Sequence, residues 1–471
     1  MSNSYGSRIA TIAELVARGG SDAGRVLASA LILSDPEFQQ QLADRLIALG
    51  PSAIVALAAI VNDPSPEVQL AARALLERFK DSRTIEPLLA QLQSPVSPAR
   101  AAAARALAKL VEKQAVDPLI RQSLSDPDPQ CRAAAREALR DIGRALIAPH
   151  SELLGSTSPT AHAKVSDALV AEGRAVVLAL TELLDHGNPL VRMTVVEILG
   201  RIADARAVEP LIPVIADPDP DVRIAAVQAL GHIKSEHAVR GLLGHLTNAD
   251  DQVATEVSHA LVVQGAAALP PVTELLSSSR RDLKTAALDI LGRIRDRRAR
   301  PAMAKCLNAP ESWLRGTAAR ALGLLGDPEA LDDLVALLQD ATPLVRASAA
   351  EALGELRVPR AVPALIAVLG RTSSTDYAGE TSGGEELIVL LAAARALGKI
   401  GDAAATESLV GLLTTEETSL RLAAVEALAD VRDPRAIPAL RNLARPWPLS
   451  PASDEVKAAA RKALKQMQPK F

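Results

Sequence analysis

Apolar residues recur along the chain at helical spacing, in two stretches separated by a short polar turn. In residues 207–217 they fall at i, i+3, i+4 and i+7, at Val208, Leu211, Ile212 and Ile215. After the turn a second stripe follows, at Val222, Ala226, Ala229, Leu230 and Ile233. This spacing predicts two amphipathic α-helices, because a strand would alternate with a period of two. We name the helix before the turn helix A and the helix after it helix B.

The pair of helices repeats along the chain. The segments DPDPDVRIAAVQALGHI (217–233), DATPLVRASAAEALGEL (340–356) and DPDPQCRAAAREALRDI (126–142) share the template V-R-x-x-A-x-x-A-L. The basic column of this template is spaced 31, 31, 30, 31 and 31 residues apart, at Arg192, Arg223, Ala254, Lys284, Arg315 and Arg346. One pair cannot bury its apolar stripe alone, whereas stacked pairs can. We therefore predict an all-α solenoid of about fourteen hairpins over residues 23–471, with residues 1–22 as an N-terminal cap helix.

The helix ends are marked by capping residues. Helix B usually opens on a short polar residue followed by proline, as at Asp128-Pro129 and Asp219-Pro220, which favours a helix start. One column near the end of helix B holds glycine in some repeats and a cationic residue in others. Glycine tolerates a left-handed cap, and a cation is favourable at the negative end of the helix dipole. The glycines are Gly50, Gly143, Gly173, Gly265, Gly326 and Gly401, and the cations are Lys80, Lys234, Arg295, Arg357 and Arg432.

Two insertions interrupt the period, RTSSTDYAGETSGGE at 371–385 and RPWPLSPAS at 445–453. Both replace the turn between helix A and helix B, so both are expected on one edge of the solenoid. Trp313 opens a helix B near that edge, which suggests a partner-binding row of Trp313, Tyr377 and Trp447 at intervals of roughly 20 Å. The alternative is a loose loop with two tryptophans packed on their own repeats.

Composition narrows the function classes. Apolar residues make up 48% of the chain and aromatics only 1%, which suits thin helices packed closely through alanine and leucine. The net charge of −4 gives no reason to expect nucleic acid as a partner. No apolar run approaches the roughly 20 residues that span a bilayer, so no membrane insertion is expected. Cys131 and Cys306 occupy apolar positions of predicted helices, which, with no secretion signal at the N-terminus, favours a cytoplasmic location.

The template resembles HEAT repeats, specifically the short phycobilisome-lyase-type HEAT-like repeats. The resemblance implies a right-handed superhelix with helix A outside and helix B on the concave face. It also implies a structural ladder in which a turn aspartate meets a helix-B arginine of a neighbouring repeat. The ladder residues here are Arg132, Arg223, Arg346, Asp126, Asp217 and Asp340. Where the aspartate is absent, the arginine is expected to bind turn carbonyls instead.

The template position five residues after the basic column should lie exposed on the concave face. It is occupied by Glu137, Asp167, Glu197, Gln228, His259, Asp289, Arg320, Glu351, Arg395, Glu426 and Lys462. The middle of the column leans acidic, and Glu137, Asp167 and Glu197 are candidate partner-binding residues. Two interpretations stay open: a solvated face of mixed charge, or an acidic groove for a basic partner.

Motifs for chemistry are missing from the sequence. There is no phosphate-binding loop, no nucleophile elbow and no metal-spaced cysteine pair, and none of the seven histidines is followed directly by glutamate, as the metal-binding dyads of deoxyhypusine hydroxylases would require. We expect no metal and no cofactor. The sequence favours a protein-binding scaffold or assembly factor, acting through the concave face and one loop edge, over an enzyme. The alternative is a phycobilin lyase subunit or a phycobiliprotein-handling factor, which the repeat subtype alone supports.

Overall fold

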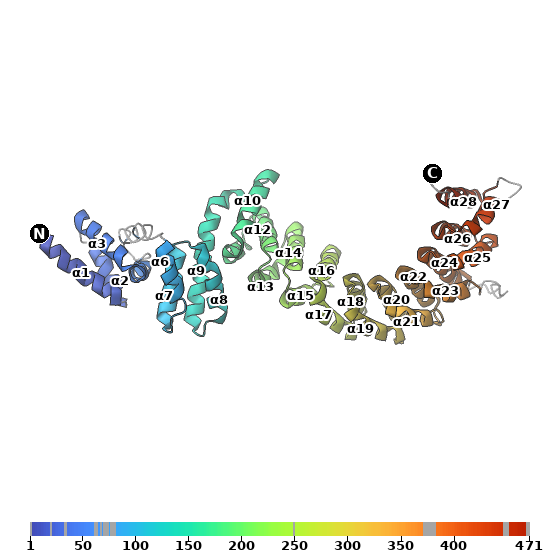
Figure 1. Cartoon of the computed structure of the whole chain (residues 1–471), viewed down its shortest axis with the longest axis horizontal. Helices are drawn as coiled ribbons and strands as arrows, with labels where there is room; N and C mark the ends of the chain where they lie inside the picture. Colours follow the sequence, from blue (N-terminus) through green and yellow to red (C-terminus); the bar gives the residue numbers. More distant parts are fainter. Residues whose placement is uncertain are drawn as a thin grey trace. The chain divides into compact units, whose positions relative to one another are not determined.

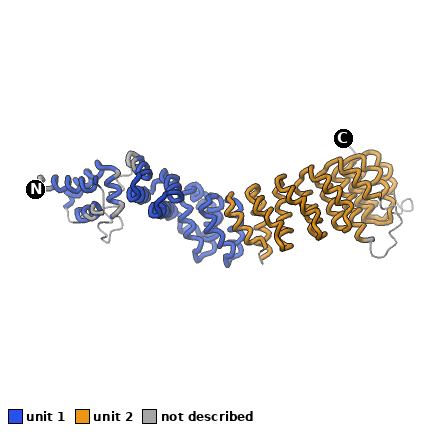
Figure 2. Tube along the Cα trace, turned by 90° about the horizontal axis from the view of Figure 1, so that it is seen from below, with its two compact units in different colours: residues 1–233 blue, residues 234–471 orange. Residues whose placement is uncertain are grey.

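The computed structural model describes residues 2–18, 21–32, 35–60, 65, 68, 75, 82–247, 250–370, 383–445 and 452–467. Over these ranges every regular element is a helix, which confirms the predicted all-α solenoid. The helices form two compact units, Met1–Ile233 and Lys234–Phe471 (Figure 2).

Unit 1 begins with α1, which packs on α2, α3 and α4. From α6 onwards helix A and helix B alternate as the sequence predicts, except between α9 and α10 (Figure 1). The α-helices described in unit 1 are α1 (Ser2–Arg18), α2 (Ser21–Ile32), α3 (Pro36–Leu49), α4 (Pro51–Ile60), α6 (Ser82–Gln91), α7 (Ser97–Lys109), α8 (Val116–Ser125), α9 (Pro129–Ile147), α10 (Pro159–Glu172), α11 (Val177–Thr181), α12 (Pro189–Ile202), α13 (Val208–Leu211) and α14 (Pro220–His232).

Unit 2 continues the alternation, and each of its B helices contacts the next B helix directly. Figure 1 shows these B helices along the inner side of the unit's curve and the A helices along its outer side. The A helices are α15 (Glu236–Leu243), α17 (Leu269–Glu274), α19 (Arg300–Lys305), α21 (Leu331–Leu337), α23 (Val362–Leu369), α25 (Thr406–Gly411) and α27 (Ile437–Leu443). The B helices are α16 (Asp251–Gln264), α18 (Arg281–Ile294), α20 (Ser312–Leu325), α22 (Pro343–Leu356), α24 (Gly383–Ile400), α26 (Thr418–Val431) and α28 (Asp454–Met467).

Contacts between glycine and alanine hold successive B helices at close range. A Cβ placed on Gly323 of α20 would lie 2.7 Å from the Cα of Ala352 on α22, so only glycine fits there. The same relation recurs in the pairs Gly200 and Ala229, Gly292 and Ala321, Gly354 and Ala396, and Gly398 and Ala427. Backbones that approach this closely need small side chains, which explains why the core is rich in alanine and poor in aromatics.

Some B helices end as predicted, whereas Gly50, Gly173 and Gly265 have positive φ with ψ between −124° and −131°, outside the left-handed helical region, and Lys80 lies outside the described residues. Gly326 and Gly401 adopt positive φ at the ends of α20 and α24, and Arg357 occupies the same column with φ 51°. Gly143 is not a cap, contrary to the prediction, because α9 continues to Ile147. The glycine is needed for packing instead, since a Cβ on it would lie 2.9 Å from the carbonyl oxygen of Ala175. Lys234 follows Ile233, which itself caps α14 in an extended conformation.

Some A helices are shorter than predicted. Residues 207–217 hold the four-residue α13 and then a 3₁₀ segment, η5 (Pro213–Ala216). Pro213 has no N–H to donate to an α-helical bond, so the chain tightens there. After the long α9, helix A is replaced by the 3₁₀ segment η2 (Ala148–Leu153).

One described stretch is long and apolar enough to cross a membrane by length and composition alone. It is Asp251–Ser277, with 27 residues, a mean hydropathy of 1.3 and 39% of its apolar window buried. The stretch is broken at Gly265, where φ is +60°, into α16 and α17. Both helices pack against α18, so in this fold the stretch forms parts of two neighbouring hairpins.

Candidate functional site

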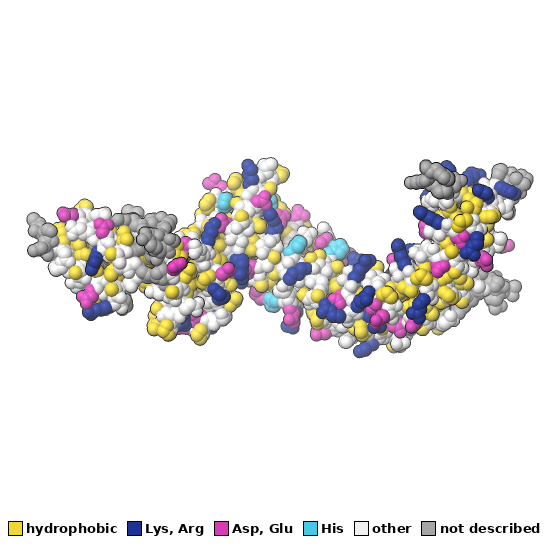
Figure 3. All heavy atoms as spheres, in the orientation of Figure 1, with side chains coloured by type: hydrophobic (Ala, Val, Ile, Leu, Met, Phe, Trp, Pro, Cys, Tyr) yellow, Lys and Arg dark blue, Asp and Glu magenta, His cyan; other side chains and the backbone are white. Residues whose placement is uncertain are grey.

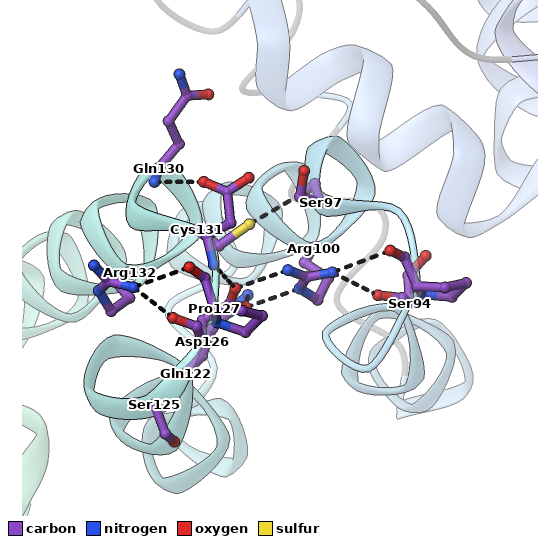
Figure 4. Close-up of polar contacts among 12 residues, drawn as sticks. Ser94, Ser97, Arg100, Gln122, Ser125, Asp126, Pro127, Gln130, Cys131 and Arg132 are labelled. Carbon is purple, nitrogen blue, oxygen red and sulfur yellow. Dashed lines mark hydrogen bonds and ion pairs between the residues drawn. The ribbon is translucent and has the colours of Figure 1, made fainter.

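The turns between helix A and helix B carry a ladder of arginine–aspartate pairs. Arg100 of α7 donates from Nε and Nη2 to the carboxylate of Asp126 in the next turn, at 2.8 and 2.7 Å (Figure 4). Arg192 and Asp217 form the same bidentate pair, and so do Arg315 and Asp340. Each aspartate thus joins its own turn to helix B of the preceding repeat.

The other predicted ladder residues bind backbone. Arg132 donates from Nη1 to the carbonyl oxygens of Asp126 and Pro127, within its own turn (Figure 4). Arg223 and Arg346 bind the equivalent carbonyls of their turns. Arg100, Arg192 and Arg315 also make this contact while holding an aspartate. The carbonyl contact therefore accompanies the aspartate pair, whereas the sequence led us to expect it as a substitute.

Beside the insertion at 371–385, Arg346 pairs with Glu386 at the start of α24. The repeat that carries this insertion has no aspartate at the usual turn position, and Glu386 supplies the carboxylate. The pair ties α22 to α24, next to residues 371–382, which lie outside the described residues.

A second ladder runs along the opposite edge, where helix B leads into the next helix A. Asp204 accepts hydrogen bonds from Arg174 Nε and Arg206 Nε, each at 2.9 Å, and Asp433 accepts from Thr406 Oγ1 at 2.7 Å. Sequence reasoning missed this ladder. Its signal is a recurrent D-x-x-A at the start of helix A, at 204–207, 296–299, 327–330, 402–405 and 433–436.

Both ladders stabilise ionised carboxylates. The guanidinium of Arg100 lowers the pKa of Asp126 to about 2, with further help from the N–H of Asp128. Burial raises the pKa of Asp204, but hydrogen bonds from Arg206 and Arg174 outweigh it and bring the pKa to about 2. These groups are occupied by structural contacts, so they are poor candidates for ligand binding.

The column predicted for the concave face is exposed throughout, except that Asp289 is half-buried. In unit 1 two of its acidic residues have partners: Asp167 pairs with Arg201 at 2.8 Å, and Glu197 contacts the ring of His162 at 2.9 Å. Glu137 is exposed on α9.

In unit 2 four successive B helices enclose a groove of about 1360 Å³. Its floor is formed by Ala321, Ala352 and Ala396, which are the alanines that pack against the glycine column of the preceding helices. The close approach of the helices therefore shapes the groove. Figure 3 shows basic and acidic side chains interspersed over the face of unit 2 that it presents.

The groove carries six cationic and four anionic side chains, so it is not acidic. Most of them are paired or stacked: Arg280 with Asp282, Arg293 with Asp289, Lys399 with Glu355, and Arg281 over the ring of Trp313. Arg320, Glu351 and Arg395 make no hydrogen bond or ion pair with any described residue, and all three are exposed.

Trp313 is the aromatic residue of the predicted edge row that the structure describes. It is half-buried near the start of α20, with the guanidinium carbon of Arg281 4.8 Å from its ring centre. Arg281 lines the groove, so the tryptophan borders it through this cation–π contact. Tyr377 and Trp447 lie outside the described residues.

Among the described residues, no group of three or more histidine, cysteine, aspartate or glutamate side chains could hold a metal ion. Cys131 and Cys306 are buried and unpaired, and burial raises the pKa of both thiols. The exposed charged groove of unit 2 is therefore the best candidate site in the described part of the chain.

Comparison with protein families gives matches to HEAT repeats at residues 54–140, 177–262, 268–347, 305–380 and 384–465, well over half of the chain. The chain belongs to the HEAT repeat family. The match is to HEAT repeats in general and does not confirm the phycobilisome-lyase-type subclass. No curated protein matches the chain.

Several solved structures are similar to this HEAT repeat protein. Kap95p, solved in a study of how its binding affects the switch loops of RanGDP, is 15% identical, with a TM-score of 0.42 over 95% of this chain and 72% of that one. Kap121p bound to Ste12p is 14% identical, with a TM-score of 0.45 over 98% of this chain and 53% of that one, so the chain spans about half of Kap121p. An engineered protein is 21% identical, with a TM-score of 0.24 over 86% of this chain and 98% of that one. Likeness of this extent carries no inference about function.

Proposed function

We propose that this HEAT repeat protein is a protein-binding scaffold, and that the groove on the B helices of unit 2 holds a segment of its partner. The observation that supports this proposal most is the contrast in unit 2 between charged residues that are paired in the ladder and charged residues that are exposed in the groove. Arg315 and Asp340 of the ladder hold each other in a bidentate pair, whereas Arg320, Glu351 and Arg395 face solvent in the groove and have no ion-pair partner among the described residues. Charged groups in a concave, small-residue surface favour binding of a polar polypeptide over catalysis.

The groove suits a segment of chain better than a whole folded surface. The alanines of its floor are buried, and its charged side chains are exposed except for the half-buried Asp289. A segment can place its backbone and short side chains over the alanines while its long side chains reach the charges. The finer role of assembly factor follows from this proposal only if the bound partner belongs to a larger complex.

Quantitative affinity capture from the native host tests the proposal. The double variant Arg320→Glu/Arg395→Glu reverses two exposed charges without touching a packed contact, so it should fold as the wild type does and lose its partners by tenfold or more. The matched control is Arg441→Glu, which reverses an exposed charge on α27, an A helix. Equal recovery of every partner by the double variant would remove the groove from the binding surface.

A further inference from the structure

Charges of alternating sign follow the inner face of unit 2, one on each successive B helix. From α18 to α28 the row is Asp289, Arg320, Glu351, Arg395, Glu426 and Lys462. The first four line the groove and the last two continue beyond it. We name these six residues the charge row. The regular order over six helices makes the row a candidate for recognition.

The charges of the row do not neutralise one another. Asp289 pairs with Arg293 on its own helix at 3.0 Å. The other five make no ion pair or hydrogen bond within the parts of the chain that the structure describes, and each is exposed. Neighbours of opposite sign thus stand further apart than ion-pair distance, and the five charges from Arg320 to Lys462 are open to a ligand.

The spacing of the row limits what can match it. Packed helices lie about 8–10 Å apart. A polyproline II segment repeats every three residues with a rise of 3.1 Å each, or about 9.3 Å, and it points every third side chain to the same face. A β-strand returns to the same face after about 6.6 Å or 13 Å, and neither distance fits.

An α-helix is the alternative ligand for the groove. To span three layers, about 20 Å, it needs a cylinder about 10–12 Å wide. An extended segment of seven residues covers the same length with a thinner cross-section.

We infer that the charge row binds a polyproline II segment of the partner protein that carries charges of alternating sign at every third residue, in the pattern acid–x–x–base–x–x–acid. An acid lies over Arg320, a base over Glu351 and an acid over Arg395. This inference rests on the proposed function and names the kind of segment that the groove takes. Such a segment is largely extended before it binds, so little conformational entropy is lost on ordering.

The test uses synthetic, fluorescently labelled peptides and the full-length chain. The peptide EPPKPPEPPKPPE matches Arg320, Glu351, Arg395, Glu426 and Lys462, and its charge pattern is the same in both chain directions. A control of equal composition places its five charges side by side. Fluorescence anisotropy at low ionic strength should show the spaced peptide binding at least tenfold more tightly than the control, with affinity falling as salt is added.

A charge swap in the protein makes the test sharper. In the Glu351→Lys variant, the charge row carries three successive positive charges, on α20, α22 and α24. The variant should therefore prefer EPPEPPEPPKPPE to EPPKPPEPPKPPE, reversing the wild-type order. The matched control is Asp333→Lys, an exposed acid on α21, which should leave the wild-type order unchanged.

Three outcomes would overturn the inference: equal binding of spaced and clustered peptides, an unchanged order in Glu351→Lys, or preference for a helical peptide with charges seven residues apart. If partner capture still depends on Arg320 and Arg395, any of these results refutes the spacing rule alone. Loss of that dependence would refute the proposed function itself.

Discussion

Arg315 of α20 and Asp340 of the following turn form a bidentate pair, with Nε to Oδ2 at 2.7 Å and Nη2 to Oδ1 at 2.9 Å. The side chains are only 16% and 8% exposed. Asp340 also accepts the N–H of Thr342, and its carbonyl accepts from Arg346. The turn that carries Asp340 is thus bonded to α20 through Arg315 and to α22 through Arg346. The Arg315–Asp340 pair holds the two repeats in register.

Asp340→Asn should destabilise unit 2 by about 3 kcal/mol, because it leaves the nearly buried guanidinium of Arg315 without a counter-charge. The loss should be local, so amide hydrogen exchange in α20 and α22 is the suitable measurement. Asp333→Asn, at an exposed position of α21, should change stability by less than about 0.5 kcal/mol. Similar exchange rates in both variants would show that the ladder contributes little.

Acid should release the ladder of unit 1 in a defined pH window. Arg100 lowers the pKa of Asp126 to about 2, whereas an aspartate in the unfolded chain titrates near about 3.9. A depressed pKa contributes stability that is complete above pH of about 4 and is lost as the pH falls towards about 2. The difference in melting temperature between wild type and Asp126→Asn should therefore be constant above this window and shrink within it. A difference that grows on acidification would contradict the assignment.

The glycine column should resist even a single methyl group. Gly323→Ala places a Cβ 2.7 Å from the Cα of Ala352, so α20 and α22 must separate at a cost of about 1–3 kcal/mol. Gly411→Ala is the control of opposite sign, because Gly411 ends α25 with helical φ and nothing lies within 4 Å of a Cβ there. Gly411→Ala should leave the free energy of unfolding unchanged or raise it by up to about 1 kcal/mol. Thermal unfolding of both variants measures the contrast.

The repeat, its register and most helix ends could be predicted from the sequence, because each depends on local periodicity and capping. The length of α9 could not. Its last residues are good helix formers, so the helix runs through Gly143, and only the contact with Ala175 explains that glycine. The sequence contains the proline at which helix A breaks, Pro213. The four-residue length of α13 reflects packing in the stack.

The candidate site was predictable in its positions and not in its chemistry. The sequence indicated that Arg320, Glu351 and Arg395 share one exposed column. It could not show that Glu355 is paired with Lys399 of the next B helix while these three are unpaired among the described residues, since that depends on side-chain distances across helices. The second ladder at Asp204 and Asp433 has a recurrent sequence signal, yet its partners in the preceding repeat, Arg174 and Thr406, lie 30 and 27 residues away.

The most direct test of the account is site-specific photo-crosslinking in the native host. A benzophenone amino acid replaces Leu324, which lines the groove and is 36% exposed, or Asp333, which is exposed on α21. The account predicts a discrete protein adduct from position 324 and none from position 333. Adducts from position 333 alone, or the same adducts from both positions, would contradict a binding site on the inner face of unit 2.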